Sequence, residues 1–185
     1  KSGYEVVGFD VNKDLIEDLK AYKSHVEGIS ISDIQQANYQ PSSDPSSIIG
    51  SDVVVIAVPT PLDENRKPDL LFLDAACRII GENLKNKALI INESTSFPGT
   101  LRDLISKQIE EISGLNHLYA ASPERVDPGN PVWNQTNTPR LVAGLTEEAT
   151  DKAIDFYSKF CSNVVPVSSP EVAEAAKLLD RKSTR

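Results

Sequence analysis

The chain has 185 residues, of which 39% are hydrophobic and 25% are charged, which suits one globular domain, or one domain and the start of another. The formal net charge of -8 argues against a nucleic-acid-binding protein, and no stretch approaches the roughly 20 consecutive apolar residues that a membrane helix needs. Two cysteines are too few for a disulfide framework, so we expect a cytoplasmic protein in a reducing compartment.

The first predicted elements are a short buried strand at 4–10, YEVVGFD, and a helix for which Asn12 is a suitable N-cap. The apolar stripe of this helix consists of Leu15, Ile16, Leu19 and Tyr22. Residues 23–50 are polar and rich in Ser, Pro and Asp, and we interpret them as a connecting segment.

The next predicted strand, DVVVIAV at 52–58, is a continuous apolar and β-branched run, which is typical of a strand buried on both faces. A turn-rich loop leads to a helix at 69–85, whose apolar stripe consists of Leu73, Cys77, Ile80 and Leu84. The stripe indicates that Cys77 is a small buried hydrophobe. Neither Cys77 nor Cys161 has the surroundings of a nucleophile.

Strands and helices continue to alternate to the end of the chain. Strands are predicted at ALIINES, LYAAS, RLVAGL and NVVPVS. Thr100 and Asp103 have capping-box spacing at one helix start, Thr146 begins a second helix, and Ser169 with Pro170 begins a third. The alternation predicts an α/β fold with a doubly wound parallel sheet and helices on both faces.

In such a sheet, ligands bind beyond the carboxyl ends of the strands, where this sequence has several polar groups. Asp10 ends a strand in the form G-x-D, which in a dinucleotide-binding fold binds the ribose hydroxyls, although an ordinary helix-capping Asp is an equal alternative. Thr60 lies between two prolines in VPTP, which would present its hydroxyl rigidly or simply make a turn.

NESTSFPGT places Glu93, Ser94 and Thr95 between a strand end and a helix start, where hydroxyls suit a phosphate or hydroxyl ligand but also serve as caps. Lys177 lies among small apolar residues, which can lower a lysine pKa for acid/base work. Its alternative is a solvated lysine paired with Glu174. SPERVDPGN, beginning at Ser122, is a Pro- and Gly-rich loop that carries two acids and an arginine directly after a strand.

Five segments, GFDV, VPTPLDENRKPDL, ESTSFPGT, SPERVDPGN and AEAAKLL, together resemble the UDP-glucose/GDP-mannose dehydrogenase family. The likeness extends from about Gly3 to Leu179 and is greatest to the branch that oxidises UDP-N-acetylglucosamine and UDP-N-acetylmannosamine at C6. The resemblance implies a Rossmann-like domain, NAD as cofactor, a UDP-sugar substrate, a homodimer or higher homo-oligomer, a role in polysaccharide precursor synthesis, and no nucleic-acid or membrane partner.

The resemblance also implies roles for individual residues. Asp10, Thr60 and Thr95 match positions that contact NAD. Arg125 and Val126 match positions that contact the nucleotide-sugar, and Glu124 matches an acid that acts with water. Lys177 matches the lysine that serves as acid/base and stabilises the oxyanion at the substrate. The alternative for SPER is a rigid surface turn with a solvated Glu-Arg pair.

The sequence has no methionine, so we expect a fragment that begins upstream and lacks the family's first strand and Gly-rich loop, as well as its catalytic cysteine. We expect residues 1–168 to form the NAD-binding domain and 169–185 to begin the helix toward a central dimerisation domain, with 180–185 departing from the family pattern. This chain alone is expected to be inactive. The alternatives are a non-catalytic nucleotide-sugar-binding remnant and a lysine-dependent dehydrogenase of the β-hydroxyacid type.

Overall fold

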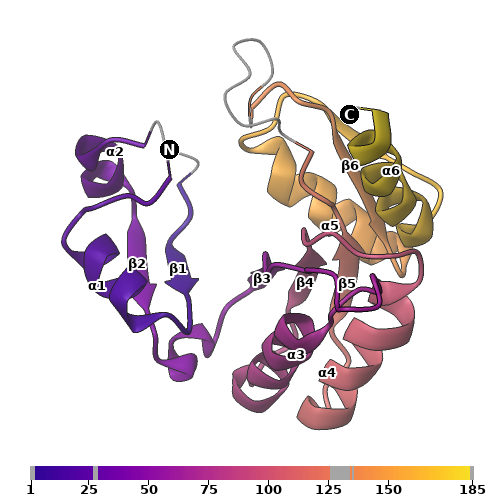
Figure 1. The fold of residues 1–185 in the computed structure, drawn as a ribbon, viewed down its shortest axis with the longest axis horizontal. Helices are drawn as coiled ribbons and strands as arrows, with labels where there is room; N and C mark the ends of the chain where they lie inside the picture. Colours follow the sequence, from indigo (N-terminus) through magenta and orange to yellow (C-terminus); the bar gives the residue numbers. More distant parts are fainter. Residues whose placement is uncertain (1–2, 27–28, 126–133, 135, 184–185) are drawn as a thin grey trace. The chain divides into compact units, whose positions relative to one another are not determined.

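A computed structural model describes residues 3–26, 29–125, 134 and 136–183. The chain divides into two compact units, Lys1–Ile49 and Gly50–Arg185 (Figure 1). Each contains parallel strands and helices, which confirms the predicted α/β class.

The first unit contains a two-stranded parallel sheet of β1 (Val6–Phe9) and β2 (Tyr39–Ser42). Helix α1 (Lys13–Lys20) follows β1, and its N-cap is Asn12 as predicted, since the Asn12 side chain accepts from the Asp14 and Leu15 N–H groups. Gly8 is required in β1 because a Cβ there would lie 2.1 Å from the Tyr39 hydroxyl oxygen.

Two predictions for this unit were wrong. The segment 23–50 is not merely a connection, because it forms α2 (Ile31–Gln36), β2 and the short helix η1 (Pro45–Ile48). Strand β2 was not predicted because it contains Pro41 and polar residues. Its formation depends on pairing with β1, which is far away in the sequence. Strand β1 is also not buried, since Val6 and Val7 are 46% and 38% exposed.

The second unit contains a five-stranded sheet with the order β3-β4-β5-β6-β7. Its strands are β3 (Val53–Ile56), β4 (Leu89–Asn92), β5 (Leu118–Ala121), β6 (Arg140–Gly144) and β7 (Val164–Pro166). All neighbours are parallel except β5 and β6. A parallel pair needs a crossover, usually a helix, and β6 follows β5 without a helix among the described residues that connect them. The predicted parallel sheet with helices is confirmed, except that β6 pairs with β5 in the antiparallel direction.

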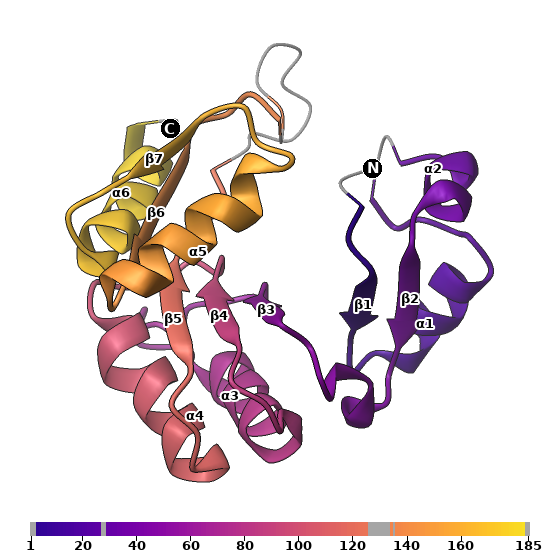
Figure 2. The same ribbon diagram turned by 180° about the vertical axis from the view of Figure 1, so that it is seen from behind.

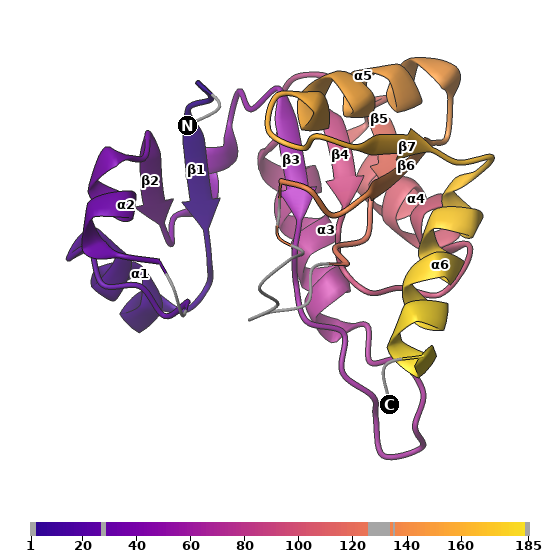
Figure 3. The ribbon, with the colours of Figure 1, turned by 90° about the horizontal axis from the view of Figure 1, so that it is seen from above.

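Helices cover both faces of this sheet, as Figures 2 and 3 show. Helix α5 (Glu147–Ser158) covers one face. The other face carries α3 (Leu71–Asn83), η2 (Leu101–Ile105) with α4 (Ser106–Ser113), and α6 (Pro170–Ser183). The core between the sheet and α5 includes Ile91, Ala120, Val142 and Tyr157. The stripe through Cys77 is buried, as predicted.

The helix starts test the capping predictions. Thr146 caps α5 as expected, since its hydroxyl accepts from the Ala149 N–H at 3.1 Å, and α6 begins at Pro170. The capping box at Thr100 was wrong, because Thr100 has helical backbone angles and its hydroxyl donates to the Phe97 carbonyl. The start of η2 is instead capped by a side chain from α6. Over the described ranges, no helix is both long and apolar enough to span a bilayer.

Candidate functional site

The carboxyl ends of β3, β4 and β5 lie side by side, and their hydrogen bonding continues beyond the strands. The Glu93 N–H donates to the Ile56 carbonyl at 2.9 Å, and the Ser122 N–H donates to the Asn92 carbonyl at 3.0 Å. The Glu124 N–H donates to the Glu93 carbonyl at 3.3 Å. The first residues of the EST and SPER motifs therefore lie on one continuous edge of the sheet, as the sequence predicted for a ligand site.

The loops that carry Thr60 and Thr95 are joined by the hydroxyl of Ser94. This buried hydroxyl accepts from the Val58 N–H at 2.9 Å and lies 3.4 Å from the Ile56 carbonyl. The bonds attach the loop after β3 to the loop after β4. Thr60 and Thr95 are themselves half-buried, so part of each side chain remains accessible at this edge.

The centre of the edge is occupied by Arg140, the first residue of β6, which is only 5% exposed. Its Nη1 lies 3.0 Å from Glu93 Oε1 and 3.3 Å from the Ser122 carbonyl oxygen, and its Nη2 lies 2.5 Å from Glu124 Oε2. The guanidinium carbon lies 4.6 Å from the centre of the Tyr157 ring, which adds a cation–π contact. Arg140 thus joins Glu93 and Glu124, which follow two different strands.

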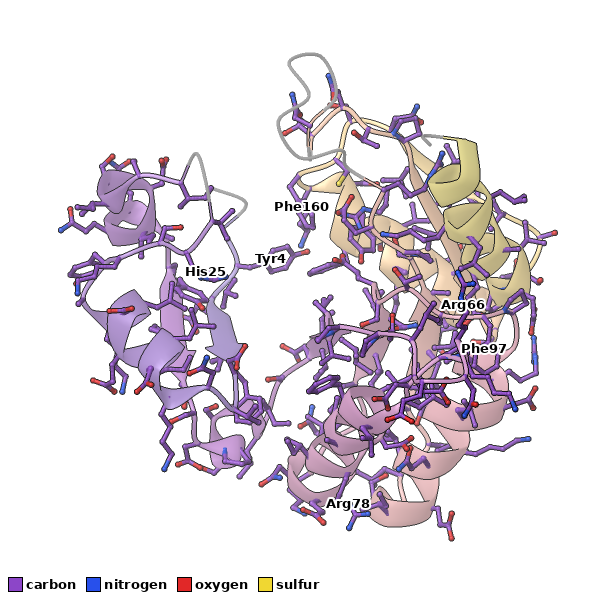
Figure 4. All side chains as sticks on the ribbon, in the orientation of Figure 1. Tyr4, His25, Arg66, Arg78, Phe97 and Phe160 are labelled. Atoms are coloured by element: carbon purple, nitrogen blue, oxygen red, sulfur yellow. The ribbon has the colours of Figure 1, made fainter. Side chains whose placement is uncertain are left out.

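Tyr157 completes this network from α5. Its hydroxyl donates to Glu93 Oε1 at 2.6 Å. The ring is held edge-on by Phe156 and Phe160, with centroid distances of 5.0 and 5.6 Å; Phe160 is labelled in Figure 4. Aromatic packing therefore fixes the tyrosine that orients the Glu93 carboxylate.

The network sets the ionisation of its members. Burial raises the pKa of Glu93, while Arg140, the Tyr157 hydroxyl and Lys177 favour the ionised carboxylate. Burial disfavours the charged form of Arg140, but the carboxylates of Glu93 and Glu124 outweigh this effect and raise the pKa of the guanidinium. Burial and the neighbouring Glu93 charge both raise the pKa of Tyr157, so its hydroxyl remains a donor.

Lys177 lies on α6, which packs against β5 and β6. Three residues earlier, Glu174 is completely buried. Its carboxylate accepts from the Gly99 N–H at 2.7 Å and the Leu101 N–H at 2.9 Å, and the Ser96 hydroxyl lies 3.3 Å away. Glu174 therefore caps η2 from inside the protein and does not lie on a solvated helix face. The alternative of a solvated lysine paired with Glu174 stays a prediction.

The SPER loop is described as far as Arg125, and Val126 lies outside the described residues. The Arg125 N–H donates to Glu124 Oε1 at 2.6 Å, while the other oxygen of this carboxylate bonds to Arg140. The Glu124 side chain is 26% exposed. The alternative of a solvated Glu-Arg surface pair therefore does not describe Glu124, which is bound to a buried guanidinium.

Asp10 belongs to the other unit and ends β1. Its Oδ1 accepts from the Asn12 N–H at 2.8 Å, and Asn12 supplies the cap of α1. The alternative of a simple helix-capping Asp is therefore wrong. A half-buried carboxylate at the carboxyl end of a parallel strand fits the position that binds the ribose of a dinucleotide.

The two cysteines are both buried in this structure. Burial raises the pKa of the Cys77 thiol to about 12, and it also raises the pKa of Cys161. Because the thiolate is the reactive form, neither side chain is suited to nucleophilic attack, in agreement with the sequence analysis.

Sequence reasoning missed the parts played by Arg140, Tyr157 and Glu174. The sequence did contain one signal for Arg140, because this residue begins the apolar strand RLVAGL. A charged side chain that becomes buried needs a partner of opposite charge. The identity of the partner was not available, because Arg140 and Glu93 are 47 residues apart. For Glu174, the helical spacing to Lys177 gave no sign of the bonds to Gly99 and Leu101.

Residues 1–161 match the NAD binding domain of the UDP-glucose/GDP-mannose dehydrogenase family. Protein CapL of Staphylococcus aureus is 32% identical over 182 residues, which covers 96% of this chain and 43% of CapL. The UDP-N-acetyl-D-glucosamine 6-dehydrogenase of Pseudomonas aeruginosa is 32% identical over 187 residues, which covers 95% of this chain and 43% of that protein. The chain thus spans less than half the length of these relatives.

Solved structures show the same similarity. The UDP-D-ManNAc dehydrogenase of Pyrococcus horikoshii has a TM-score of 0.90 at 28% identity, with 99% of this chain and 46% of that one covered. The native UDP-N-acetyl-mannosamine dehydrogenase Cap5O of Staphylococcus aureus has a TM-score of 0.86 at 27% identity, again with 99% and 46% covered.

Proposed function

Because the chain belongs to the UDP-glucose/GDP-mannose dehydrogenase family, we propose that it is the NAD-binding part of a UDP-N-acetyl-hexosamine 6-dehydrogenase. The family resemblance expected from the five motifs is confirmed, as is NAD as the cofactor of the matching domain. The reaction converts the C6 alcohol of the sugar to a carboxylate in two hydride transfers, for polysaccharide precursor synthesis. The observation that carries the proposal is the edge where Glu93, Glu124 and Arg140 meet the helix that bears Lys177.

Asp10, Thr60 and Thr95 are the residues that would hold NAD. Asp10 is half-buried at a strand end, with a carboxylate oxygen suited to ribose hydroxyls. Thr60 and Thr95 lie on the two loops that Ser94 joins, so their spacing is fixed without a ligand. Bound NAD would supply the acceptor for the hydride that leaves C6.

Lys177, Glu124 and Arg125 are the residues that would act on the sugar nucleotide. Lys177 would take the proton of the C6 hydroxyl and stabilise the oxyanion that develops there. Glu124 would orient water and accept its proton. Arg125, together with Val126, would contact the nucleotide-sugar, where a planar guanidinium suits anionic groups.

The second oxidation requires a nucleophile that captures the aldehyde at C6. The buried, high-pKa thiols of Cys77 and Cys161 do not fit this role. We therefore propose that the reactive cysteine lies outside these 185 residues and that this chain alone produces no NADH.

The first test is an NADH assay on the complete product of the reading frame, with UDP-N-acetylglucosamine and UDP-N-acetylmannosamine as substrates. We expect two NADH for each uronate formed, and none from residues 1–185 alone. K177A should lower kcat on the order of 10²- to 10⁴-fold, as expected for loss of a general acid/base. K152A is the matched control, because Lys152 is exposed on α5 and pairs with Glu148.

Two results would contradict the proposal. NADH formed by the 185 residues alone would contradict the expected inactivity of this chain, and uronate formed by them would show that the nucleophile is within them. A complete protein that binds UDP-sugars in calorimetry but forms no NADH would support the non-catalytic alternative instead.

A homo-oligomeric parent protein in the cytoplasm is also part of the proposal, without a nucleic-acid or membrane partner. The sequence pI of about 4.8 supports the absence of nucleic-acid binding. Light scattering on the complete protein measures its oligomeric state, and a monomer at assay concentrations would contradict this part.

A further inference from the structure

The direction of β6 brings Arg140 to the edge where the candidate catalytic groups lie. Strands β5 and β6 are antiparallel, with Ala120 opposite Gly144 and Ala121 opposite Ala143. Continuing this register by three residues, from 121 to 124 and from 143 to 140, places Arg140 opposite Glu124. The start of β6 therefore meets the carboxyl ends of β4 and β5, which a parallel β6 could not do.

The contacts of Arg140 are specific to a guanidinium. Its Nη1 bonds to Glu93 and to the Ser122 carbonyl, while Nη2 bonds to Glu124. The planar fork fits these acceptors in one geometry, whereas a lysine ammonium would be a single point charge. At 5% exposure, the side chain is too enclosed to serve as a surface ion pair.

The Glu124 carboxylate lies in a cluster of charged groups that belong to several elements. Arg140 faces it from β6, Glu93 from the end of β4, and Cys161 lies beyond the end of α5, where the Glu124 charge influences its thiol. Arg125 precedes the rest of the loop and bonds to Glu124 through its backbone. The positive charge of Lys177 on α6 also acts on this cluster, because it favours the ionised form of Glu93. Arg140 is the member that bonds directly to the Glu124 carboxylate from a rigid strand.

We propose that Arg140 is a positioning residue for the dehydrogenase reaction, which holds the Glu124 carboxylate ionised and in a fixed orientation beside the Glu93 loop. The inference rests on the proposed function, in which Glu124 acts with water. A buried guanidinium attached to the central sheet restricts the carboxylate to one position, whereas a side chain on a loop alone would leave it free to rotate. Small displacements of a catalytic group are costly to rate, so this restriction matters for turnover.

The test compares R140Q, R140K, E93Q and the double variant R140Q/E93Q in the complete protein. We expect R140Q to lower kcat by on the order of tenfold to a hundredfold with an unchanged KM for NAD. The acid limb of its kcat/KM profile should move to higher pH by about one unit, because an adjacent positive charge favours an ionised carboxylate. R140K keeps the positive charge but not the planar guanidinium. Its acid limb should therefore lie between those of wild type and R140Q, and its kcat should recover less.

The double variant also removes the Glu93 carboxylate, which R140Q leaves buried without its ion-pair partner, so it retains the test if R140Q alone fails to fold. R78Q is the matched control, because Arg78 lies exposed on α3, away from this edge (Figure 4). A thermal unfolding scan of each variant separates loss of stability from loss of turnover. An acid limb that lies at the same pH in R140Q/E93Q as in the single variant E93Q would overturn the inference.

A second measurement does not need activity. Carbon NMR follows the titration of the Glu124 carboxyl in the 185-residue chain, with E124Q used to assign the signal. A midpoint at higher pH in R140Q/E93Q than in the single variant E93Q supports the positioning role, and equal midpoints in these two variants overturn it. If wild-type protein forms no NADH but the midpoint moves, the proposed function has failed and the electrostatic role of Arg140 stands.

Discussion

Glu174 lies on the buried side of α6, and its carboxylate accepts from the N–H groups of Gly99 and Leu101. Burial raises the pKa of this group, while the two backbone donors and the Ser96 hydroxyl favour the charged form. Leu101 begins η2 and Gly99 lies two residues before it, at a helix start where N–H groups have no partner within the helix and where negative charge is favoured. One side chain therefore satisfies a helix start that is more than 70 residues away in the sequence, 73 residues for Leu101 and 75 for Gly99.

Removing this cap should destabilise the protein. We expect E174A to lower the free energy of unfolding by about 2–5 kcal/mol, because it leaves two buried backbone donors without acceptors. E174Q should cost less, since its amide oxygen can still accept one of the two bonds. Urea unfolding of the 185-residue chain measures both.

The control for this prediction is E148A, because Glu148 is 57% exposed and pairs with Lys152 within α5. Exposed pairs of this kind contribute about 0.3–0.5 kcal/mol. An E174A variant that is no less stable than E148A would show that the buried carboxylate does not cap η2.

At the scale of elements, α6 is attached to η2 by two acids with different surroundings. Glu174 is buried, whereas Glu171 lies nearer the surface and its Oε1 is 2.8 Å from Arg102 Nε. Hydrogen bonds from Arg102 and Ser169 lower the pKa of Glu171 to about 2. The ion pair orients the first turn of the helix that carries Lys177.

The lowered pKa predicts a pH dependence of stability. A carboxyl with a folded pKa below its ordinary value of 4.5 stabilises the fold above pH 4.5, and this contribution disappears as the pH falls toward 2. Wild type should therefore be more stable than E171Q at neutral pH, and the difference should vanish near pH 2. The effect should be small and weaken with added salt, because the pair is partly exposed.

Urea midpoints of wild type and E171Q at a series of pH values provide the measurement. E148Q serves as the control, since Glu148 forms its pair within α5 and does not join two elements. A difference between wild type and E171Q that stays constant from neutral pH to pH 2 would contradict the role given to the Arg102 pair.

At the scale of the whole molecule, the buried apolar side chains are divided unequally between the two units. In the described part of Lys1–Ile49, the buried hydrophobic residues are Ile16 and Ile48. The unit Gly50–Arg185 contains the remaining core, including the cluster between the sheet and α5. A chain of about 50 residues rarely has enough core to fold alone without a disulfide, metal or partner.

We therefore predict that residues 50–185 fold by themselves and that residues 1–49 do not. Circular dichroism and proton NMR of the two separate fragments make the comparison, with the 185-residue chain as reference. Residues 50–185 should show cooperative thermal unfolding and dispersed amide signals, and residues 1–49 should show neither. A folded 1–49 fragment, or a 50–185 fragment without a cooperative transition, would contradict the prediction.

The amino-acid sequence by itself determined the local elements and the motifs that identify the family. Helix starts at Asn12 and Thr146 were predictable because the capping side chain and the N–H groups that donate to it lie within three residues of each other. The presence of the apolar strands and the buried Cys77 stripe were predictable from local patterns. The burial of β3 on both faces was predicted wrongly, because Val55 is 38% exposed. The position of the candidate site followed from the general rule that ligands bind at the carboxyl edge of a parallel sheet.

Only the tertiary structure decided which strands pair, in which direction, and which charges meet. Strand β2 was not predicted because its sequence is polar, and the antiparallel direction of β6 beside β5 is a matter of pairing between separate strands. Arg140 with Glu93 and Glu174 with Leu101 are contacts between residues 47 and 73 positions apart. A buried charge must find a partner, but the sequence alone does not say where the partner lies, because that depends on the packing of the whole sheet.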